Sequence, residues 1–212
     1  MTMRRANRSE AVARFFTLGA PLYDTPILQR FLYRPAQDEV VALLKARSSS
    51  RVADVACGTG ILADRISREI HPDQVYGVDL SDGMLARAAQ RSSDVRWLKG
   101  PAEHLPFEDS TLDAVVTTTA FHFFDQPAAL CEFDRVLAPE GLAAVATFPS
   151  PSPPPPLRWL AATSLAAAHS PTPAGLREMF EQAGFLVSDQ HRVRRPGWPP
   201  PFSDLLTVGV KS

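Results

Sequence analysis

The sequence predicts one α/β domain in which helices cover both faces of a mostly parallel sheet. Strand-like and helix-like segments alternate from residue 51 onward, which is typical of parallel strands joined by crossover helices. A glycine turn, Cys57-Gly58-Thr59-Gly60, joins the first strand to the first helix, where a backbone can approach a ligand closely. The chain has 212 residues and 45% hydrophobic side chains, which suffices for one sizeable core but is short for two stable domains.

The first half of the expected domain is built around the glycine turn. The apolar residues after the turn have the spacing of one buried helix face, and either Ser81 or Asp82 can cap the second helix. The expected elements are a strand at Arg51–Ala56, a helix at Ile61–Ile70, a strand at Gln74–Asp79 and a helix at Met84–Arg91.

The same alternation continues after a third strand at Val95–Lys99. A fourth strand is expected at Leu112–Thr118, because this segment is rich in valine and threonine. A helix at Gln126–Leu137 should end where Pro139 forbids its continuation, and Gly141 opens a fifth strand that runs through Phe148.

The C-terminal part begins with Pro149–Pro156, which is almost entirely proline and serine. This stretch is expected to be a stiff connector, either a plain linker or a rim that shapes the mouth of a substrate site. Helices are expected at Leu157–His169 and Pro173–Gln182, followed by strands at Phe185–Val193 and Leu205–Val210. The last two strands are too close in sequence for a crossover helix, so they must be antiparallel.

Composition favours a small-molecule ligand. The formal net charge is −1 and no long block of like charge occurs, so we expect no nucleic acid as a partner. No apolar stretch approaches the roughly 20 residues of a membrane-spanning helix, so we expect no membrane insertion. Cys57 and Cys131 lie far apart and suggest neither a disulfide framework nor a metal site, which favours the reducing cytoplasm. The oligomeric state stays open.

Two carboxylates flank the glycine turn and narrow the choice of ligand. Gly58-x-Gly60-x-x-Ala63 fits the dinucleotide fingerprint, and Asp79 lies where a carboxylate can accept hydrogen bonds from ribose hydroxyls. Asp54 at the end of the first strand would repel a pyrophosphate but would favour a ligand with an ammonium or sulfonium group. Asp54 can also cap amides of its own loop. Cys57 is expected to be a packing residue, because no histidine lies near it in sequence to activate the thiol.

Several segments in order resemble the class I S-adenosylmethionine-dependent methyltransferases, and within them the ubiquinone and menaquinone C-methyltransferases. The resemblance runs from about Tyr23 to Phe148. Asp54–Gly60 resembles the first motif of this family, with Ala56 at a glycine position, and Val78-Asp79-Leu80-Ser81 with Met84-Leu85 resembles the second. Gly100–Phe107 resembles the loop that closes on the adenine edge. There Pro101 replaces an aspartate and loses its hydrogen bond to adenine, although the amide of Ala102 can still supply one.

The resemblance implies a Rossmann-like, doubly wound seven-stranded sheet with an antiparallel last strand, S-adenosyl-L-methionine as cofactor, and methyl transfer to a small acceptor. The many phenylalanines suggest that this acceptor is aromatic or lipid-like. The resemblance also implies one domain, with an N-terminal helical lid or substrate segment at 1–48, a cofactor-binding core at 49–148 and the remainder at 149–212. Tyr23 resembles a residue that lies over the methionine end of the cofactor. The residues expected to bind the cofactor are Tyr23, Asp54, Ala56, Cys57, Gly58, Gly60, Asp79, Leu80, Ser81, Met84, Pro101, Ala102, Glu103 and Thr118.

His122 is the candidate general base. Methyl transfer is an in-line displacement, so the protein chiefly aligns the acceptor and excludes water, but an acidic acceptor can need a base. His122 follows the fourth strand, at the end of the sheet where ligands bind in open α/β folds, and histidine titrates near neutral pH. Phenylalanines surround it in sequence, so a structural histidine in an apolar wall is an equal interpretation.

Two other functions stay open at this point. An NAD(P)-dependent oxidoreductase would use the same glycine turn and Asp79, but Asp54 opposes it. A scaffold that binds the cofactor or a partner protein without catalysis is suggested by the departures from the family pattern at Ala56, Pro101 and Glu140.

Overall fold

The computed structural model describes residues 33–147, 170–194 and 203–212. The strands are β1 (Arg51–Val55), β2 (Gln74–Asp79), β3 (Arg96–Lys99), β4 (Leu112–Thr118), β5 (Leu137–Thr147), β6 (Phe185–Arg192) and β7 (Leu205–Lys211). The helices are α3 (Arg34–Arg47), α4 (Ile61–Ile70), α5 (Asp82–Arg91), α6 (Gln126–Val136) and α8 (Pro173–Gln182), with the short 3-10 helix η2 (Phe121–Phe123) after β4.

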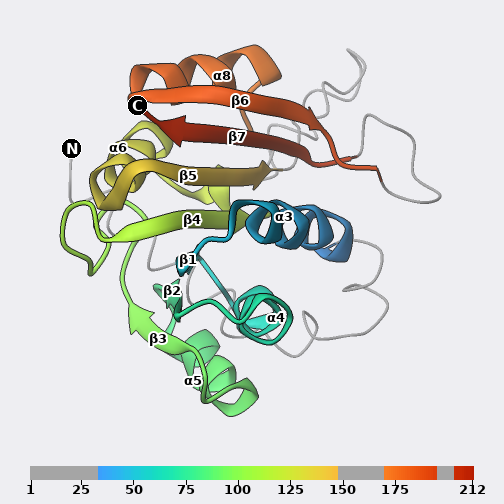
Figure 1. The fold of residues 1–212 in the computed structure, drawn as a ribbon, viewed down its shortest axis with the longest axis vertical. Helices are drawn as coiled ribbons and strands as arrows, with labels where there is room; N and C mark the ends of the chain where they lie inside the picture. The colour runs from blue at the N-terminus through green and yellow to red at the C-terminus, as the bar shows by residue number, and fades with distance from the viewer. Residues whose placement is uncertain (1–32, 148–169, 195–202) are drawn as a thin grey trace, which may run out of the picture.

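The strands form one seven-stranded sheet in the order β3-β2-β1-β4-β5-β7-β6 (Figure 1). The five strands from β1 to β5 are parallel, whereas β7 is antiparallel to both β5 and β6. This topology confirms the predicted Rossmann-like sheet and the antiparallel pairing of its last two strands.

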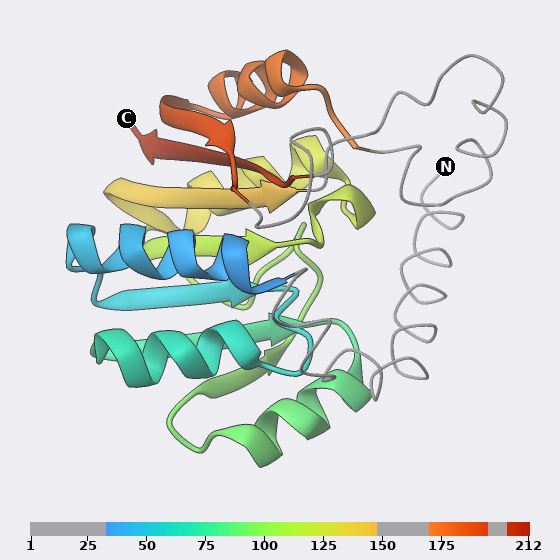
Figure 2. The same ribbon diagram turned by 90° about the vertical axis from the view of Figure 1, so that its right-hand side faces the viewer.

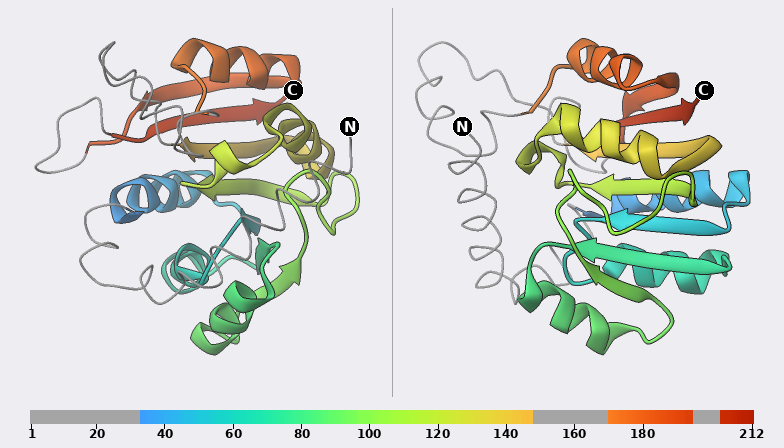
Figure 3. Two further views of the ribbon diagram at one scale, coloured as in Figure 1. Left: turned by 180° about the vertical axis from the view of Figure 1, so that it is seen from behind. Right: turned by 90° about the vertical axis from the view of Figure 1, so that its left-hand side faces the viewer.

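Helices cover the sheet on both faces, and each face has its own apolar core. Figure 2 shows α3 and α4 in front of the sheet, and the right-hand view of Figure 3 shows α6 in front of the opposite face. On the first face, Val40 of α3 and Ile66 of α4 pack with Val52 of β1. On the second face, Phe133 of α6 and Phe180 of α8 pack with other strand residues. Burial of these side chains explains why the amphipathic segments fold as helices against the sheet.

The strand order places an opening at one edge of the sheet. β1 lies between β2 and β4, because the chain winds outward from β1 toward β3 and then returns to the other side of β1. In open α/β sheets, ligands bind outside the carboxyl ends of the strands at this point of reversal. The residues that follow β1, β2 and β4 are therefore brought together.

Most predicted boundaries agree with the structure, and two differ for physical reasons. Helix α5 begins at Asp82 rather than Met84, because Ser81 is its N-cap and the Ser81 Oγ accepts a hydrogen bond from the Met84 amide at 3.2 Å. Strand β5 begins at Leu137 rather than Gly141. Its pairing with β4 shifts register beside Glu140, which has a φ of 62°. A bulge of this kind lets the strand begin before the glycine that the sequence suggested as its start.

Part of the predicted N-terminal segment belongs to the sheet core. Residues 34–47 form α3, which buries Val40 and Leu44 against the first face. The lid function expected for 1–48 stays a prediction, and Tyr23 lies outside the described residues. The proline-rich connector at 149–156 and the helix expected at 157–169 also lie outside them.

Candidate functional site

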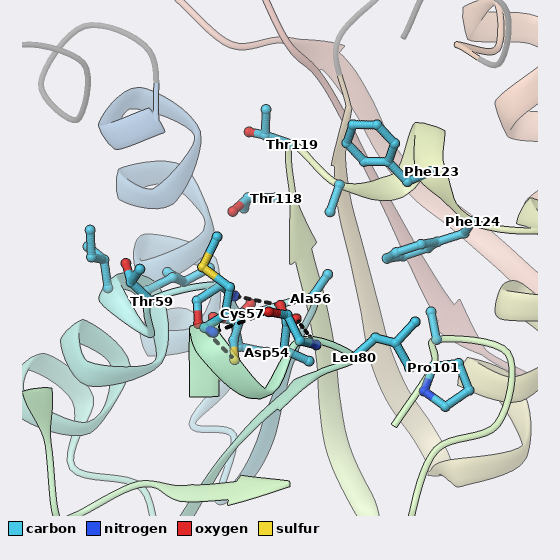
Figure 4. Close-up of a pocket in the computed structure, with 18 of the residues that line it drawn as sticks. Asp54, Ala56, Cys57, Thr59, Leu80, Pro101, Thr118, Thr119, Phe123 and Phe124 are labelled. Atoms are coloured by element: carbon cyan, nitrogen blue, oxygen red, sulfur yellow. Dashed lines mark hydrogen bonds between the residues drawn. The ribbon is translucent and has the colours of Figure 1, made fainter. Parts of the chain in front are cut away.

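A pocket lies at the carboxyl ends of β1, β2 and β4, where the topology predicts a ligand site (Figure 4). Its walls come from the glycine turn, the loop after β2, the loop after β3, the segment after β4 and the start of α3. The lining residues are Tyr33, Gln37, Asp54, Ala56, Cys57, Gly58, Thr59, Ile61, Leu62, Asp79, Leu80, Ser81, Met84, Gly100, Pro101, Ala102, Glu103, Thr118, Thr119, Ala120, Phe123 and Phe124.

Asp54 is a buried carboxyl with spare hydrogen-bonding capacity. The residue is 2% exposed, and among the described residues its Oδ2 atom has no hydrogen-bond partner. Burial and the nearby charge of Asp79 raise the pKa of Asp54 to about 8, against the opposing effect of a hydrogen bond with the Ala63 backbone. An isolated buried carboxylate is costly, so a cationic group in the pocket would stabilise the ionised form.

Asp79 at the end of β2 organises the turn opposite it. Its Oδ2 accepts the Gly58 amide at 2.9 Å and its Oδ1 accepts the Ser81 amide at 2.8 Å. Burial raises the pKa of Asp79, although these backbone hydrogen bonds favour its charged form. Because each carboxylate oxygen can accept more than one hydrogen bond, Asp79 retains capacity for hydroxyl groups of a ligand.

The glycine turn has left-handed backbone at several positions. Ala56 has a φ of 57° and Gly58 a φ of 55°, a conformation that glycine adopts at little cost and alanine at a cost of about 1 kcal/mol. This conformation explains the glycine of the family motif at position 56. Gly60, expected to bind the cofactor, does not line the pocket. It lies behind the turn with a φ of 79°, and a Cβ there would collide with the ring of Trp97.

Cys57 lines the pocket as a protonated thiol. Burial raises the pKa of Cys57 well above its ordinary value, and the charges of Asp54 and Asp79 add to this effect. A thiol in these surroundings is a poor nucleophile. This environment is consistent with the packing role that we expected for Cys57.

The loop after β3 is held against α6 by charged side chains. Glu132 accepts the Leu105 amide at 2.6 Å and pairs with the Arg135 guanidinium, also at 2.6 Å. Arg135 donates in turn to the carbonyl oxygens of Leu105 and Phe107. These contacts hold the backbone at Leu105 and Phe107, in the same loop whose Pro101 and Ala102 line the pocket.

Glu103, expected to bind the cofactor, lines the pocket but already has a structural partner. Its Oε1 accepts the amide of Asp125 at 2.7 Å. Asp125 is the N-cap residue of α6. Glu103 therefore joins the loop after β3 to the segment after β4, across one side of the pocket.

The wall after β4 is apolar and aromatic. Phe123 and Phe124 line the pocket, and Figure 4 shows them across it from Asp54 and Cys57. Phe121 is fully buried behind them and meets Phe124 edge to face, with ring centroids 5.8 Å apart. The two phenylalanines offer ring faces to a ligand beside the carboxylates.

His122, the predicted general base, is not among the pocket-lining residues. It is 6% exposed, and its ring centroid lies 4.0 Å from that of Phe123. The side chain therefore packs against the aromatic wall, as expected if His122 is a structural residue of that wall rather than a base. Catalysis by His122 stays a prediction.

Twelve of the predicted cofactor residues line the pocket: Asp54, Ala56, Cys57, Gly58, Asp79, Leu80, Ser81, Met84, Pro101, Ala102, Glu103 and Thr118. The sequence interpretation missed Tyr33 and Gln37 at the start of α3. Proline at the first turn of α3 is a signal of a helix start and could have placed these residues at the sheet edge. The segment after β4 was considered only for His122, so Thr119 was also missed.

Comparisons with known proteins agree with this geometry. Residues 53–145 match the family model described as a methyltransferase domain. A demethylmenaquinone methyltransferase of Thermus thermophilus is 38% identical over 145 residues, which is 64% of this chain and 65% of that protein. A malonyl-[acyl-carrier protein] O-methyltransferase of Pectobacterium atrosepticum is 36% identical over 141 residues, 65% of this chain and 53% of that protein. The chain thus spans less than two thirds of the length of these relatives.

A solved structure from Thermotoga maritima has the same fold. It is described as a SAM-dependent methyltransferase, possible histamine N-methyltransferase. It is 22% identical, has a TM-score of 0.71, and the match covers 94% of this chain and 99% of that one. At this identity the likeness concerns the fold alone. The matching family model and the named relatives support a class I S-adenosylmethionine-dependent methyltransferase domain over residues 53–145, and the sheet order is the Rossmann-like fold of that class.

Proposed function

We propose that this chain transfers a methyl group from S-adenosylmethionine to a small aromatic acceptor that carries a ring hydroxyl. The observation that carries the proposal is the buried Asp54 carboxyl, which lines the pocket with an oxygen that has no partner among the described residues. A phosphate-free cationic ligand suits this group, whereas a dinucleotide would bring its pyrophosphate close to the carboxyls of Asp54 and Asp79.

The residues of the pocket fit the parts of this cofactor. Asp54 is suited to the ammonium of its methionine portion, and Asp79 retains acceptor capacity for the ribose hydroxyls. Leu80 and Met84 supply apolar contacts for the adenine ring, and Pro101 and Ala102 close its edge. The amide of Ala102 takes over the recognition that an aspartate at position 101 would supply.

When bound, the cofactor supplies an electrophilic methyl group on a sulfonium. The protein aligns the acceptor with this methyl group and excludes water. Such alignment can lower the free-energy barrier to methyl transfer by several kcal/mol. Phe123 and Phe124 are placed to stack on a flat acceptor and to keep water from the reacting atoms.

The acceptor class rests on the aromatic wall and on the names of the relatives. The Thermus thermophilus relative is named for demethylmenaquinone, and a relative from Nostoc punctiforme, 33% identical over 153 residues, is named for 2-phytyl-1,4-naphtoquinone. The two compounds share a naphthoquinone ring. The reduced form of such a ring carries hydroxyl groups and activates the ring carbon beside them. We therefore propose a reduced naphthoquinone or a related naphthol as acceptor, with His122 kept as the proposed general base.

The two cysteines bear on where the protein is located. Within the described ranges, no helix combines the length and apolar character needed to span a bilayer. Cys57 and Cys131 are both free thiols, which is consistent with the reducing cytoplasm that we propose.

Calorimetric titration with S-adenosylhomocysteine and with NAD tests the cofactor. We expect binding of the first and none of the second; the reverse result would favour the oxidoreductase. Transfer of a labelled methyl group to reduced demethylmenaquinone, 1-naphthol and non-aromatic alcohols tests the acceptor. Cofactor binding without transfer to any of them would favour a non-catalytic scaffold.

A further inference from the structure

Thr119 has a backbone conformation that is costly for its side chain. It follows the last residue of β4 and has a φ of 61°. A positive φ is a genuine outlier for a β-branched residue and costs about 1 to 3 kcal/mol. The Thr119 amide donates to the Ala146 carbonyl oxygen at 2.8 Å, so the sheet itself holds the residue in this conformation.

The hydroxyl of Thr119 belongs to a pocket-lining residue and lacks a hydrogen-bond partner among the described residues. Its oxygen atom, Oγ1, is buried. A buried hydroxyl without a partner typically costs 1 to 3 kcal/mol. Strain and an unsatisfied hydroxyl therefore coincide at one lining residue, a combination expected where a ligand completes the hydrogen bonding.

The position of Thr119 separates it from the cofactor-binding carboxyls. Asp54 and Asp79 lie at the ends of β1 and β2, whereas Thr119 and Phe123 both come from the segment after β4 (Figure 4). A flat ligand that lies against Phe123 and Phe124 would present its edge to this part of the pocket. Thr119 therefore lies on the side of the pocket that the proposed function assigns to the acceptor.

We propose that the Thr119 hydroxyl binds a ring hydroxyl of the aromatic acceptor and selects acceptors that carry one. This inference rests on the proposed function, because it assumes that the aromatic side of the pocket holds the acceptor. A site with a buried polar group discriminates strongly against ligands that leave the group unpaired. Thr119 is thus a specificity-determining residue that contacts the acceptor directly.

The test compares two ligands of nearly the same shape on the complex with S-adenosylhomocysteine. 1-Naphthol carries a ring hydroxyl, and 1-methylnaphthalene carries a methyl group in its place. Binding of both is measured for the wild type, Thr119→Val and Thr119→Ser. The hydration free energy of each ligand is the same for all variants. It therefore cancels when the ratio of the two affinities is compared between variants.

We expect the preference of the wild type for 1-naphthol to fall about fivefold in Thr119→Val, as expected for one neutral hydrogen bond, and to persist in Thr119→Ser. Affinity for S-adenosylhomocysteine should stay within about twofold in both variants. Thr119→Ala, which lacks both the hydroxyl and the branched side chain, serves the same comparison if the valine variant is unstable.

An unchanged preference in Thr119→Val, or no binding of 1-naphthol to the wild type, would overturn the assignment. A parallel loss of affinity for S-adenosylhomocysteine would also overturn it, because the hydroxyl would then serve the cofactor. Failure of the proposed function looks different: 1-naphthol would bind with the expected dependence on Thr119, but labelled methyl would not be transferred to any acceptor.

Discussion

Asp54 and Asp79 lie at the carboxyl ends of the paired strands β1 and β2, and the charge of Asp79 adds to burial in raising the pKa of Asp54 to about 8. A positive ligand would favour the ionised form of Asp54, whereas a negative ligand would oppose it. The protonation of Asp54 should therefore be linked to ligand binding.

Binding of S-adenosylmethionine should release close to one proton at pH 7. Asp54 is largely protonated in the free protein at this pH, and a cationic ligand favours its ionised form. Calorimetry in buffers of different ionisation enthalpy measures the release, and Asp54→Asn should abolish it. Equal binding enthalpies in all buffers for the wild type would contradict the prediction.

The same carboxyl should make the free protein less stable as the pH rises. The folded pKa of Asp54 lies above the ordinary value of 3.8, so the folded state binds more protons between these values. The free energy of unfolding should fall from about pH 4 to about pH 8, by up to about 1.4 kcal/mol per pH unit. Denaturant unfolding of Asp54→Asn, which cannot ionise at this position, should show a shallower pH dependence.

Replacement of Asp79 by alanine should weaken binding of S-adenosylhomocysteine by about 1 to 3 kcal/mol, because hydrogen bonds to a charged acceptor are lost. The loss includes the turn contacts to Gly58 and Ser81. Asp82→Ala is the matched control, since this nearby carboxylate is exposed and pairs with Lys99. Equal affinities of the two variants in calorimetry would show that the ribose binds elsewhere.

Glu140→Gly should stabilise the protein by about 0.5 to 1 kcal/mol. Glu140 is exposed and has a φ of 62°, which glycine adopts without the steric cost of a Cβ. Ala138→Gly, in the same strand but without a positive φ, should destabilise by a similar amount. Thermal unfolding of both variants is the measurement, and the same sign for the two would refute the backbone argument.

His122→Ala separates a base from a wall residue. A base predicts a loss of turnover that exceeds any loss of cofactor affinity, together with a changed pH–rate profile. Packing behind Phe123 predicts a lower melting temperature and an unchanged profile. His122→Phe, which keeps an aromatic ring at this position, should restore part of the stability in either case but restore turnover only if the residue is structural.

The sequence was informative where local pattern and burial coincide. Alternating apolar segments predicted the succession of strands and helices along the chain, and the turn around Gly58 predicted the position of the pocket. The sequence was less informative where a side chain depends on distant partners. The partner of Glu103 is the Asp125 amide, which no local spacing predicts. His122 was selected because of its chemistry, whereas its burial behind Phe123 follows from how η2 packs.

The backbone conformation of Thr119 also depends on a distant partner and could not be predicted from the sequence. A sequence cannot reveal a positive φ at a threonine, because that conformation is imposed by the pairing of its amide with Ala146. At position 140 the family pattern did give a signal, because it has glycine there. The structure explains this preference, since Glu140 has a positive φ.

Arg135 connects helix α6 to the loop after β3, which forms one wall of the pocket. Because this arginine ties α6 to the backbone at Leu105 and Phe107, in the loop whose Pro101 and Ala102 line the pocket, side chains on α6 that do not line the pocket should affect how tightly the cofactor binds. Substitutions at Arg135 or Glu132 should therefore change the affinity for S-adenosylhomocysteine, although neither side chain lines the pocket.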